Sequence, residues 1–473
     1  MTNRYHDQPL VISGVLPHLC LEADLGPPRS EGGTGAMVVW AGKLWVVTYV
    51  SHKTSSGSGT GLFEIDERLM VRKRPESVSG TYANRMIHVP SNQLIIGPHI
   101  IDAHGNVRTF EALTDMRLCG TMAHLEEPDR KVYFLSMEGE FLEADVQTLA
   151  VRQLFDLTRE LGVADDVPHD HPIQVPETVQ PHFKAGHTAQ GRVVVTNNTY
   201  DDADFAGRGA GRLAEWDGTT WRIIERTAFV DVHGRLNFGA VVFASGWDRA
   251  SAILKALVDG EWQTYRLPKS SHTFEHFWQT EWPRIREVEH ERLLMDCFGA
   301  FYELSPVPFG GRVFGIRPIA THLRVIPDFC SYRGLLVLGG NQVTPTGDVG
   351  QLVAAPQANF WFGNVDDLWN WGKPQGWGGP WWDSEVQAGL ASDPYLMTGF
   401  DKKVLHLTHR ASTAVDVTVE VDFLGTGEWR HYTTITVEPD GYDYHVFPPG
   451  FSAHWVRVKS DTDCIATAYL TYT

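Results

Sequence analysis

The stretch GRLAEWDGTTWRIIER, residues 211–226, decides the fold because it carries a strong hairpin signal. Alternating apolar residues flank Asp217-Gly218, a dipeptide that favours the tight turn between two antiparallel strands. The segment SAILKALVDGEWQTYRL, residues 251–267, repeats this ending with a second Asp-Gly turn. The repetition indicates a β-structural unit that recurs along the chain.

Short strand-like runs separated by Gly, Asn and Asp turns occur almost throughout the 473 residues, whereas amphipathic helix patterns are nearly absent. The best helical candidate is residues 145–162, whose first half also fits a pair of strands. The runs group into packets of roughly 40 to 50 residues, a repeat length typical of propeller blades. We therefore expect an all-β fold with a seven-bladed β-propeller over residues 1–375. Six or eight blades, or two β-sandwiches, are the alternatives left open.

The texture changes after GWGGPWW, residues 376–382, to long alternating strands such as STAVDVTVEVDF, residues 412–423. Alternation of this kind favours half-buried strands. Residues 376–473 are expected to form a β-sandwich-like extension that packs on the propeller or closes it. The last strand, CIATAYLTYT at residues 464–473, is expected to pair with an N-terminal strand and so close the ring.

The formal net charge of −18 disfavours nucleic acids and anionic membrane surfaces as partners. A local cluster of Arg and His can still bind an anionic small substrate. The five cysteines contain no CxxC pair, so buried free thiols are expected rather than disulfides or a thiolate zinc site. No basic and apolar leader opens the sequence, and no stretch is apolar enough for a membrane helix. We therefore expect a cytoplasmic protein and leave secretion open.

The candidate functional residues follow from the architecture of a propeller, in which the first strand of each blade lines the central channel. When the packets are aligned on that strand, His88, His124 and His187 take nearly equivalent positions in three successive blades. Imidazoles around such an axis serve as acid, base or metal ligand, or else satisfy backbone groups in a wet channel. The other residues expected near the same rim are Tyr82, Arg85, His99, Asn198, Tyr200, Gln279, Glu281, Arg284 and His322.

Three further segments concentrate reactive or aromatic residues. Residues 272–287, HTFEHFWQTEWPRIRE, suit a carbohydrate subsite in which Trp278 or Trp282 stacks on a sugar face and Arg284 or Arg286 grips a carboxylate, or else an internal ion-pair lattice. Residues 167–173, VPHDHPI, fit a metal loop or a solvated turn. The five Trp of residues 366–382 suit carbohydrate stacking or a rigid seam. The signatures GxSxG, HExxH and GxGxxG are absent, which removes the commonest hydrolase, metalloprotease and dinucleotide-binding functions.

Four segments carry a family resemblance. They are KAGHTAQGRVVVTNNTY (184–200), HFWQTEWPRIREVE (276–289), NFWFGNVDDLWNWGKPQGWGGPWW (359–382) and DPYLMTGFDKKVLHLTH (393–409). With them the chain resembles the L-rhamnose-α-1,4-D-glucuronate lyases, seven-bladed propeller enzymes that release the terminal rhamnose capping glucuronate in plant gums such as gum arabic. The resemblance covers most of the chain, including its last hundred residues. It implies a uronate-containing oligosaccharide or polysaccharide as substrate.

The reaction that the resemblance implies is β-elimination, which needs a group that neutralises the uronate carboxylate, a base for the C5 proton and an acid for the leaving C4 oxygen. The candidates are His187 or His88 for the base, His124 or His99 for the acid, and Arg85 with Arg284 for the carboxylate. A divalent cation is the alternative neutralising group. Calcium would prefer carboxylates such as Glu281, while manganese or zinc would tolerate His.

Two other functions are compatible with the same residues. An α-L-rhamnosidase-type hydrolase would act on the same disaccharide unit without forming an unsaturated uronate. A non-catalytic propeller would bind glycans or proteins through one face, since a fold does not by itself imply an activity.

Overall fold

The computed structural model describes residues 19–22, 32–50, 61–78, 80–163, 181–199, 211–235, 240–271, 282–289, 292–345 and 354–473. Within these ranges the protein is all-β, as expected. Helical geometry there is confined to three short segments, η1 (Glu111–Leu113), α1 (Leu157–Glu160) and η3 (Val365–Asn370). The helical candidate at residues 145–162 is therefore not a helix: it forms a turn, then β13 (Val151–Asp156), then the single turn of α1.

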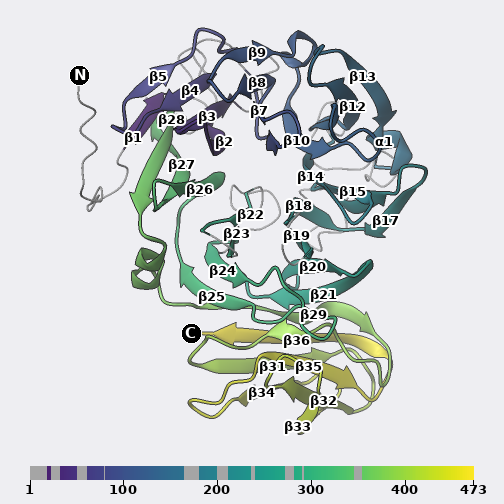
Figure 1. Ribbon diagram of the computed structural model, residues 1–473. Helices are drawn as coiled ribbons and strands as arrows, with labels where there is room; N and C mark the ends of the chain where they lie inside the picture. The colour runs from purple at the N-terminus through teal and green to yellow at the C-terminus, as the bar shows by residue number, and fades with distance from the viewer. Residues whose placement is uncertain are drawn as a thin grey trace.

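Antiparallel sheets of four strands follow one another along the chain (Figure 1). In the first three sheets the strands pair in the order in which they occur in the sequence. Their strands are β2 (Gly32–Trp40), β3 (Lys43–Val50), β4 (Leu62–Ile65) and β5 (Val71–Lys73); β6 (Arg85–His88), β7 (Gln93–Ile96), β8 (His99–Asp102) and β9 (Val107–Thr109); and β10 (Leu118–Ala123), β11 (Lys131–Ser136), β12 (Glu140–Asp145) and β13.

The next three sets of four strands repeat this order. They are β14 (Phe183–Ala189), β15 (Arg192–Asn197), β16 (Arg212–Trp216) and β17 (Trp221–Glu225); β18 (Ala228–Gly234), β19 (Val242–Trp247), β20 (Ala252–Val258) and β21 (Glu261–Leu267); and β22 (Arg284–Glu287), β23 (Leu293–Cys297), β24 (Ala300–Leu304) and β25 (Arg317–Thr321).

A further sheet joins the two ends of this series. It consists of β26 (Asp328–Tyr332), β27 (Leu335–Pro345), β28 (Ala354–Gly363) and β1 (Leu19–Glu22). Because β1 pairs with β28, an N-terminal strand completes the sheet that the later strands begin.

The sheets are arranged around a common centre, as in a β-propeller (Figure 1). The first strand of each set lies near the centre, while β5, β9, β13 and β17 lie at the rim. Each sheet packs between two neighbours, so apolar residues are buried on both of its faces. Trp45, Ile95 and Phe134, all with no exposed surface, belong to one apolar cluster that crosses the first three sheets.

The two Asp-Gly hairpins predicted from the sequence are confirmed. The second is a two-residue turn between Val258 and Glu261, and both central residues have positive φ, 49° for Asp259 and 87° for Gly260. That geometry is the mirror-image turn that matches the twist of the strands. The first connects Trp216 and Trp221 through four residues. There the Asp217 carboxylate accepts the backbone N–H groups of the two following threonines, each at 2.8 Å.

The C-terminal strands form two layers beside the propeller (Figure 1). One sheet has the order β29 (Gly376–Val386), β36 (Cys464–Tyr472), β31 (Lys403–His409) and β34 (Tyr442–Val446). The other continues the sheet of β21 through β30 (Tyr395–Leu396), β35 (Trp455–Ser460), β32 (Val415–Asp422) and β33 (Arg430–Val437).

The expected pairing of the last strand with an N-terminal strand is wrong, because β36 pairs with β29 and β31 instead. The physical reason is its alternation. Ala466, Ala468 and Leu470 of β36 are buried in the apolar cluster between the two C-terminal layers, so the strand is needed there. The Trp-rich segment at residues 366–382 contributes to the seam with the propeller, where the backbone of Trp377 pairs with that of Lys269.

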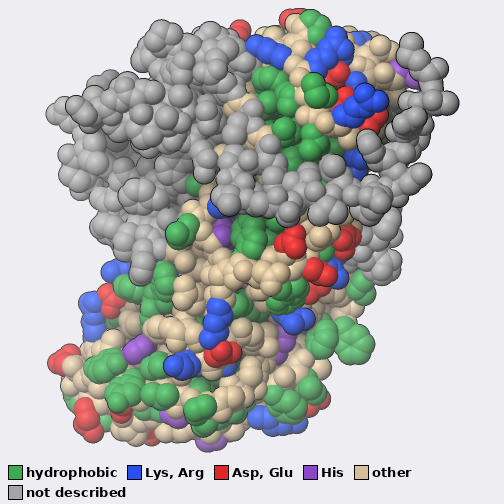
Figure 2. Space-filling model, turned by 90° about the vertical axis from the view of Figure 1, so that its left-hand side faces the viewer, with side chains coloured by type: hydrophobic (Ala, Val, Ile, Leu, Met, Phe, Trp, Pro, Cys, Tyr) green, Lys and Arg blue, Asp and Glu red, His purple; other side chains and the backbone are tan. Residues whose placement is uncertain are grey.

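Acidic and basic side chains are interspersed on the described surface in Figure 2, so the net charge is not gathered into one patch on this face. Among the described residues, no helix is long and apolar enough to cross a membrane. The thiols of Cys119, Cys297, Cys330 and Cys464 are free, the first three of them buried.

Candidate functional site

Neighbouring inner strands, meaning the first strands around the centre, run in the same direction. On β18 and β22, the carboxylate of Asp231 accepts the backbone N–H of Ile285 at 2.7 Å, and further along both strands Arg235 pairs with Glu287 at 2.8 Å. The same direction holds for β6 and β10, where Asn84 contacts Thr121 and, further along both segments, His88 contacts Pro128. It also holds for β10 and β14, where the contact of Gly120 with Gly186 is followed by that of Ala123 with Thr188. The channel therefore has a start side, where the inner strands begin, and an end side, where they end.

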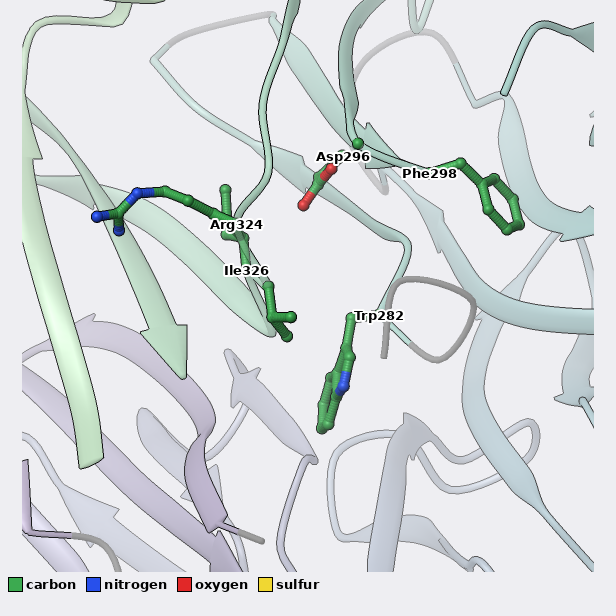
Figure 3. Close-up of a pocket in the computed structure, with 7 residues that line it drawn as sticks. Trp282, Asp296, Phe298, Arg324 and Ile326 are labelled. Atoms are coloured by element: carbon green, nitrogen blue, oxygen red, sulfur yellow. The ribbon is translucent and has the colours of Figure 1, made fainter. Parts of the chain in front are cut away.

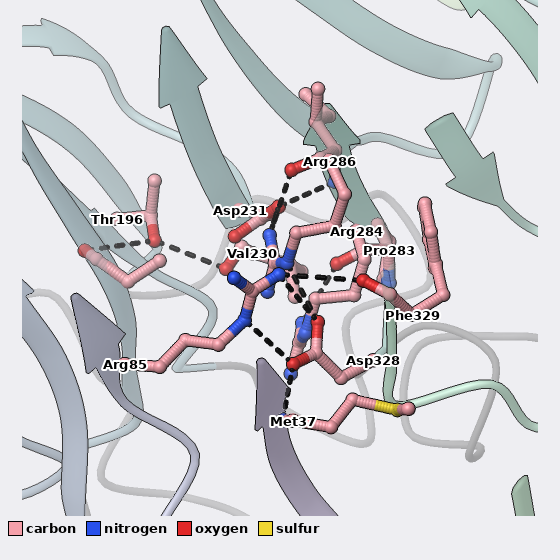
Figure 4. A network of polar contacts seen from close by, with 12 residues as sticks. Met37, Arg85, Thr196, Val230, Asp231, Pro283, Arg284, Arg286, Asp328 and Phe329 are labelled. Atoms are coloured by element: carbon pink, nitrogen blue, oxygen red, sulfur yellow. Dashed lines mark hydrogen bonds and ion pairs between the residues drawn. The ribbon is translucent and has the colours of Figure 1, made fainter. Parts of the chain in front are cut away.

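Four charged side chains meet between these two sides (Figure 4). Arg286 donates from Nη1 to Asp231 Oδ2 at 2.9 Å and from Nε to Asp328 Oδ1 at 2.6 Å. Arg85 donates from Nε to Asp328 Oδ2 at 2.8 Å. We call Arg85, Asp231, Arg286 and Asp328 the axial ion-pair layer. It ties together four inner strands, β6, β18, β22 and β26.

The axial ion-pair layer contains two arginines and two aspartates, and each of the four charges has an opposite charge beside it. Burial alone would raise the pKa of Asp328, but the charges of Arg286 and Arg85 outweigh it and hold that pKa below its usual value. Burial would likewise lower the pKa of Arg286, and the two aspartates raise it instead. Asp328 also accepts the backbone N–H of Met37 at 2.7 Å. The guanidinium of Arg85 already holds Asp328, so this pairing does not support the expected role of Arg85 as a clamp on a substrate carboxylate, which stays a prediction.

Arg284 lies two residues before Arg286 on β22, on the start side. Unlike Arg286, it has no ion-pair partner among the described residues. Its side chain is only 4% exposed, yet none of the described carboxylates lies within ion-pair distance of its guanidinium. Nη1 donates to the carbonyl of Pro283 at 2.7 Å, and the group lies 5.0 Å from the centre of the Trp282 ring. Burial lowers the pKa of Arg284 against the opposing field of Asp231. A buried cation without a counter-ion is costly, so this position suits a bound anion.

A small pocket of about 10 Å³, partly open to solvent, is lined in part by Trp282, whose ring lies 5.0 Å from the Arg284 guanidinium (Figure 3). Its lining is Trp282, Asp296, Phe298, Gly299, Arg324, Val325 and Ile326. Asp296 is the register partner of Arg284 across β22 and β23. The pocket therefore shares the start side with the unpaired guanidinium.

Two pocket residues differ in how their charges are satisfied. Asp296 Oδ1 lies 3.0 Å from His322 Nε2, and burial raises the pKa of Asp296 against the opposing effect of His322. Arg324 donates only its backbone N–H, to His322 Nδ1 at 3.1 Å, and its guanidinium has no polar partner among the described residues. Burial lowers the pKa of Arg324. The start side thus holds a second guanidinium that the described residues leave without a counter-ion.

Several buried polar atoms on the start side also lack hydrogen-bond partners within the described chain. They are the side-chain carbonyl of Asn84, both amide atoms of Asn198, both amide atoms of Asn359 and the indole nitrogen of Trp282. Buried polar groups are nearly always paired in folded proteins. Such a concentration indicates donors and acceptors kept for a ligand or for ordered water.

The end side carries a pair of imidazoles. The rings of His187 on β14 and His233 on β18 lie 5.6 Å apart between centroids, and the buried Nε2 of His187 has no hydrogen-bond partner among the described residues. Burial lowers the pKa of His187 to about 4, opposed by Asp231. Burial, then His187 and Arg286, hold the pKa of His233 well below its usual value. Both rings are therefore neutral at pH 7, beyond the axial ion-pair layer from Arg284.

The expected shared pocket of His88, His99, His124 and His187 does not form, because each ring has its own surroundings. His88 is the last residue of its inner strand and contacts Ser91 Oγ at 2.6 Å and the carbonyl of Pro128 at 2.7 Å. Both ring nitrogens of His88 are therefore engaged in contacts that link the turn after β6 to the turn after β10, and neither nitrogen is available as a base. Burial lowers the pKa of His88.

His124 and His99 are likewise built into the scaffold. His124 Nε2 lies 2.9 Å from Glu143, while Nδ1 accepts the backbone N–H groups of Glu126 and Glu127. His99 lies on β8, the third strand of its sheet, and contacts Thr109 Oγ1 at 2.9 Å. Burial lowers the pKa of His99 to about 4. The predicted equivalence of these histidines was wrong because the packets were aligned on the second strand of each sheet. That alignment does not determine where the inner strand ends, and so does not determine which residues face the channel.

The remaining candidates divide into three groups. Tyr82 is fully buried and donates its hydroxyl to the carbonyl of Thr114 at 2.6 Å, so it is structural. Asn198, Arg284 and His322 lie on the start side, where the structure brings Arg284 and the Asp296–His322 pair together. The candidates Tyr200, Trp278, Gln279 and Glu281, and the metal-loop candidate at residues 167–173, lie outside the described residues.

Five residues of the axial ion-pair layer and of its two sides were not identified from the sequence: Asp231, His233, Asp296, Arg324 and Asp328. Each carries a weak local signal, a charged or titratable residue within or just before an otherwise apolar strand. That signal would have found Asp231 and Asp328. The partner of each lies on another sheet and could not be read from spacing. No group of three or more His, Cys, Asp or Glu within the described ranges is placed to hold a metal ion.

No protein-family model and no curated protein sequence matches the chain. Among solved structures, the β-propeller domain of Cps50 (Swd1) from Myceliophteria thermophila is 11% identical and covers 70% of this chain and 98% of its own, with a TM-score of 0.39. The Dos1 propeller is 10% identical and covers 74% and 96%, with a TM-score of 0.41. An exo-β-1,3-galactanase from Phanerochaete chrysosporium is 9% identical and covers 73% and 93%, with a TM-score of 0.26. At such scores these likenesses carry no statement about activity.

Proposed function

We propose that this protein is a carbohydrate-active lyase with a seven-bladed β-propeller over residues 1–375 and a β-sandwich-like extension over residues 376–473. The sheets of β2 to β28, with β1 as the last partner, would be the seven blades. The proposed substrate is a terminal L-rhamnose-α-1,4-D-glucuronate unit of an oligosaccharide or polysaccharide, as the family resemblance implies. The single observation that supports a uronate ligand best is the buried, unpaired guanidinium of Arg284.

In this proposal Arg284 neutralises the uronate carboxylate and so acidifies the C5 proton. An interaction with a buried, water-poor guanidinium is far stronger than with an exposed one. Arg324, the second free guanidinium, would orient the same end of the substrate. Neither group carries a described carboxylate that the substrate would have to displace.

Proton transfer is assigned to the start side as well. The base removes the C5 proton, the C4–O bond breaks with formation of the C4=C5 double bond, and the rhamnose oxygen takes up a proton. Asp296 is the described carboxylate that lines the pocket, and its raised pKa suits proton transfer near neutral pH. Tyr200, close in sequence to Asn198, stays a prediction for the second group. His187 is separated from Arg284 by the axial ion-pair layer and is not assigned.

The hydrolase alternative has less support from the described residues. A glycosidase normally uses two carboxyl groups, one of them protonated. Asp231 and Asp328 are held in the axial ion-pair layer, which leaves Asp296 as the described carboxylate at the pocket. A divalent cation at the carboxylate also stays a prediction, with manganese, zinc or calcium as the candidates, and no step above depends on it.

The test is incubation of the full chain with a Rha-GlcA disaccharide, with rhamnose release and ultraviolet absorbance of the conjugated uronate recorded together. The proposal expects both signals to rise in parallel. Rhamnose release without absorbance would establish the hydrolase instead. Absence of both signals, with binding retained, would establish a non-catalytic glycan-binding propeller.

The matched variants are Asp296→Asn and Arg235→Lys. The first should abolish most of the absorbance change, because it removes the assigned proton-transfer group without changing its size. The second alters an end-side ion pair with Glu287 and should leave the rate near that of the wild type. Equal losses in both variants would contradict the assignment to the start side.

A further inference from the structure

The outward face of the C-terminal sheet β29-β36-β31-β34 carries a row of aromatic rings. Alternate residues of β31 and β36 are buried between the two layers, so the intervening ones face outward. On the edge strand β34, Tyr442 and Tyr444 are 62% and 57% exposed. We define the aromatic strip as Trp382, His406, Tyr442, Tyr444 and Tyr469.

Strand register brings these rings into one row. His406 lies opposite Tyr444 on one side and opposite Tyr469 on the other. The Tyr469 ring is 5.1 Å from that of Trp382, which extends the row to β29. Because neighbouring strands lie about 4.8 Å apart, a row across four strands spans roughly 14 Å. It is an elongated surface rather than a single contact point.

The exposed rings are held in a fixed orientation. His406 Nδ1 lies 2.8 Å from the Tyr442 hydroxyl, and its Nε2 lies 3.3 Å from Thr471 Oγ1. The planes of His406 and Tyr442 differ by 17° and those of Tyr442 and Tyr444 by 21°, with centroids 6.1 Å apart in each pair. Exposed tyrosines on a surface without a ligand have no need of such a network. Preorientation lowers the entropy lost on binding.

The charge of the strip selects among ligands. The outward residues of β31, β34 and β36 are Val404, His406, Thr408, Tyr442, Tyr444, Val446, Ile465, Thr467, Tyr469 and Thr471, none of which carries a fixed charge. The three strands β31, β34 and β36 therefore suit an uncharged ligand. At the β29 end of the row, fixed charges are present, because the Arg249 guanidinium lies 4.7 Å from the centre of the Trp382 ring and Asp383 pairs with Arg410. Rings with hydroxyl groups at their margins suit an uncharged, hydroxyl-rich chain that presents both C–H faces and O–H groups.

We propose that the aromatic strip binds a neutral stretch of polysaccharide, as a second carbohydrate site separate from the pocket at Arg284. The polymer would be held by its uncharged backbone while its terminal uronate unit reaches the propeller. The choice of ligand class rests on the proposed function, whereas the existence of a glycan surface can be tested without any activity.

The experiment is affinity electrophoresis of the full chain in gels that contain gum arabic or carboxyl-reduced gum arabic, which lacks uronate charge. Wild type should be retarded by both polymers. The variant Tyr442→Ala/Tyr444→Ala should bind each roughly tenfold more weakly, since truncating central aromatic contacts usually has the largest effect. Phe423→Ala removes a 57%-exposed ring from another strand connection and should bind like wild type. Tyr442→Phe keeps the ring and should keep most of the affinity.

The outcomes separate this proposal from the proposed function. If the strip binds glycan, the double variant still converts the Rha-GlcA disaccharide at the wild-type rate, and its defect appears only with polymer. If the chain has no lyase activity, retardation by carboxyl-reduced gum still reports on the strip. Unchanged retardation of the double variant would overturn the proposal. So would sedimentation that shows a wild-type dimer dissociated by the substitutions, because the strip would then contact a second copy.

Discussion

Arg284 and Arg286 lie two residues apart on the same inner strand, and both are buried, yet among the described residues only Arg286 has a carboxylate partner. Arg286 bridges Asp231 and Asp328 within the axial ion-pair layer. The guanidinium of Arg284 contacts the carbonyl of Pro283 and the indole ring of Trp282, and no described carboxylate pairs with it. One arginine therefore stabilises the propeller, while the other maintains an unsatisfied charge at the pocket. This difference is the reason for proposing the start side as the ligand-binding side.

The largest effect expected from this comparison is on stability in Arg286→Met. The substitution leaves Asp231 and Asp328 buried with too few counter-charges, which should lower the free energy of unfolding by about 3–5 kcal/mol. Urea denaturation at pH 7 measures it. A loss under 1 kcal/mol would mean that the layer does not hold the inner strands together.

Arg284→Met is the matched substitution and should have the opposite profile. Its loss should weaken binding of a uronate disaccharide by about 2–5 kcal/mol, or roughly 30-fold or more. Its stability should equal or exceed that of the wild type, because an unpaired buried charge has been replaced by an apolar side chain of similar length. Isothermal titration and urea denaturation give the two readouts. A variant as unstable as Arg286→Met would show that Arg284 is structural.

The end side predicts a pH dependence of stability. His187 has a pKa of about 4 in the folded protein, against about 6.5 when unfolded. Between these values the unfolded chain binds the proton and the folded chain does not, so stability is complete above pH 6.5 and falls as the pH is lowered. At pH 5 the loss from this one group is about 2 kcal/mol.

Urea denaturation at pH 7 and pH 5 checks this dependence. His187→Asn should remove part of the difference between the two pH values, whereas His104→Asn, at an exposed turn, should leave the difference unchanged. Identical pH profiles for wild type and His187→Asn would contradict the assignment of a neutral, buried imidazole.

The smallest effect is expected for His88→Gln. The substitution weakens the contacts with Ser91 and Pro128, which should destabilise the protein by about 1–2 kcal/mol. Turnover of a Rha-GlcA disaccharide should stay at the wild-type rate. A large loss of turnover with an intact fold would return His88 to the list of catalytic candidates.

The fold was largely predictable because its signals are local. Apolar alternation and the Asp-Gly turns specify hairpins within short segments, and their recurrence indicates repeated sheets. Of the proposed site, Arg284, Asn198 and His322 were candidates from the sequence, and their roles stay predictions. The partner of Arg85 is Asp328, 243 positions away in the sequence, and no spacing rule connects them. The pairing of the last strand, β36, was predicted wrongly for a similar reason. Its alternating apolar residues indicate a strand but do not show whether that strand pairs with β1 or with β29 and β31.

The most direct test of the account is a titration of the full chain with a Rha-GlcA disaccharide and with the same disaccharide reduced at its carboxyl group. Wild type should bind the acid form at least tenfold more tightly, and Arg284→Met should bind both forms with the same weak affinity. Equal binding of the two forms by wild type, or an undiminished preference in Arg284→Met, would contradict the claim that Arg284 is kept unpaired for a uronate.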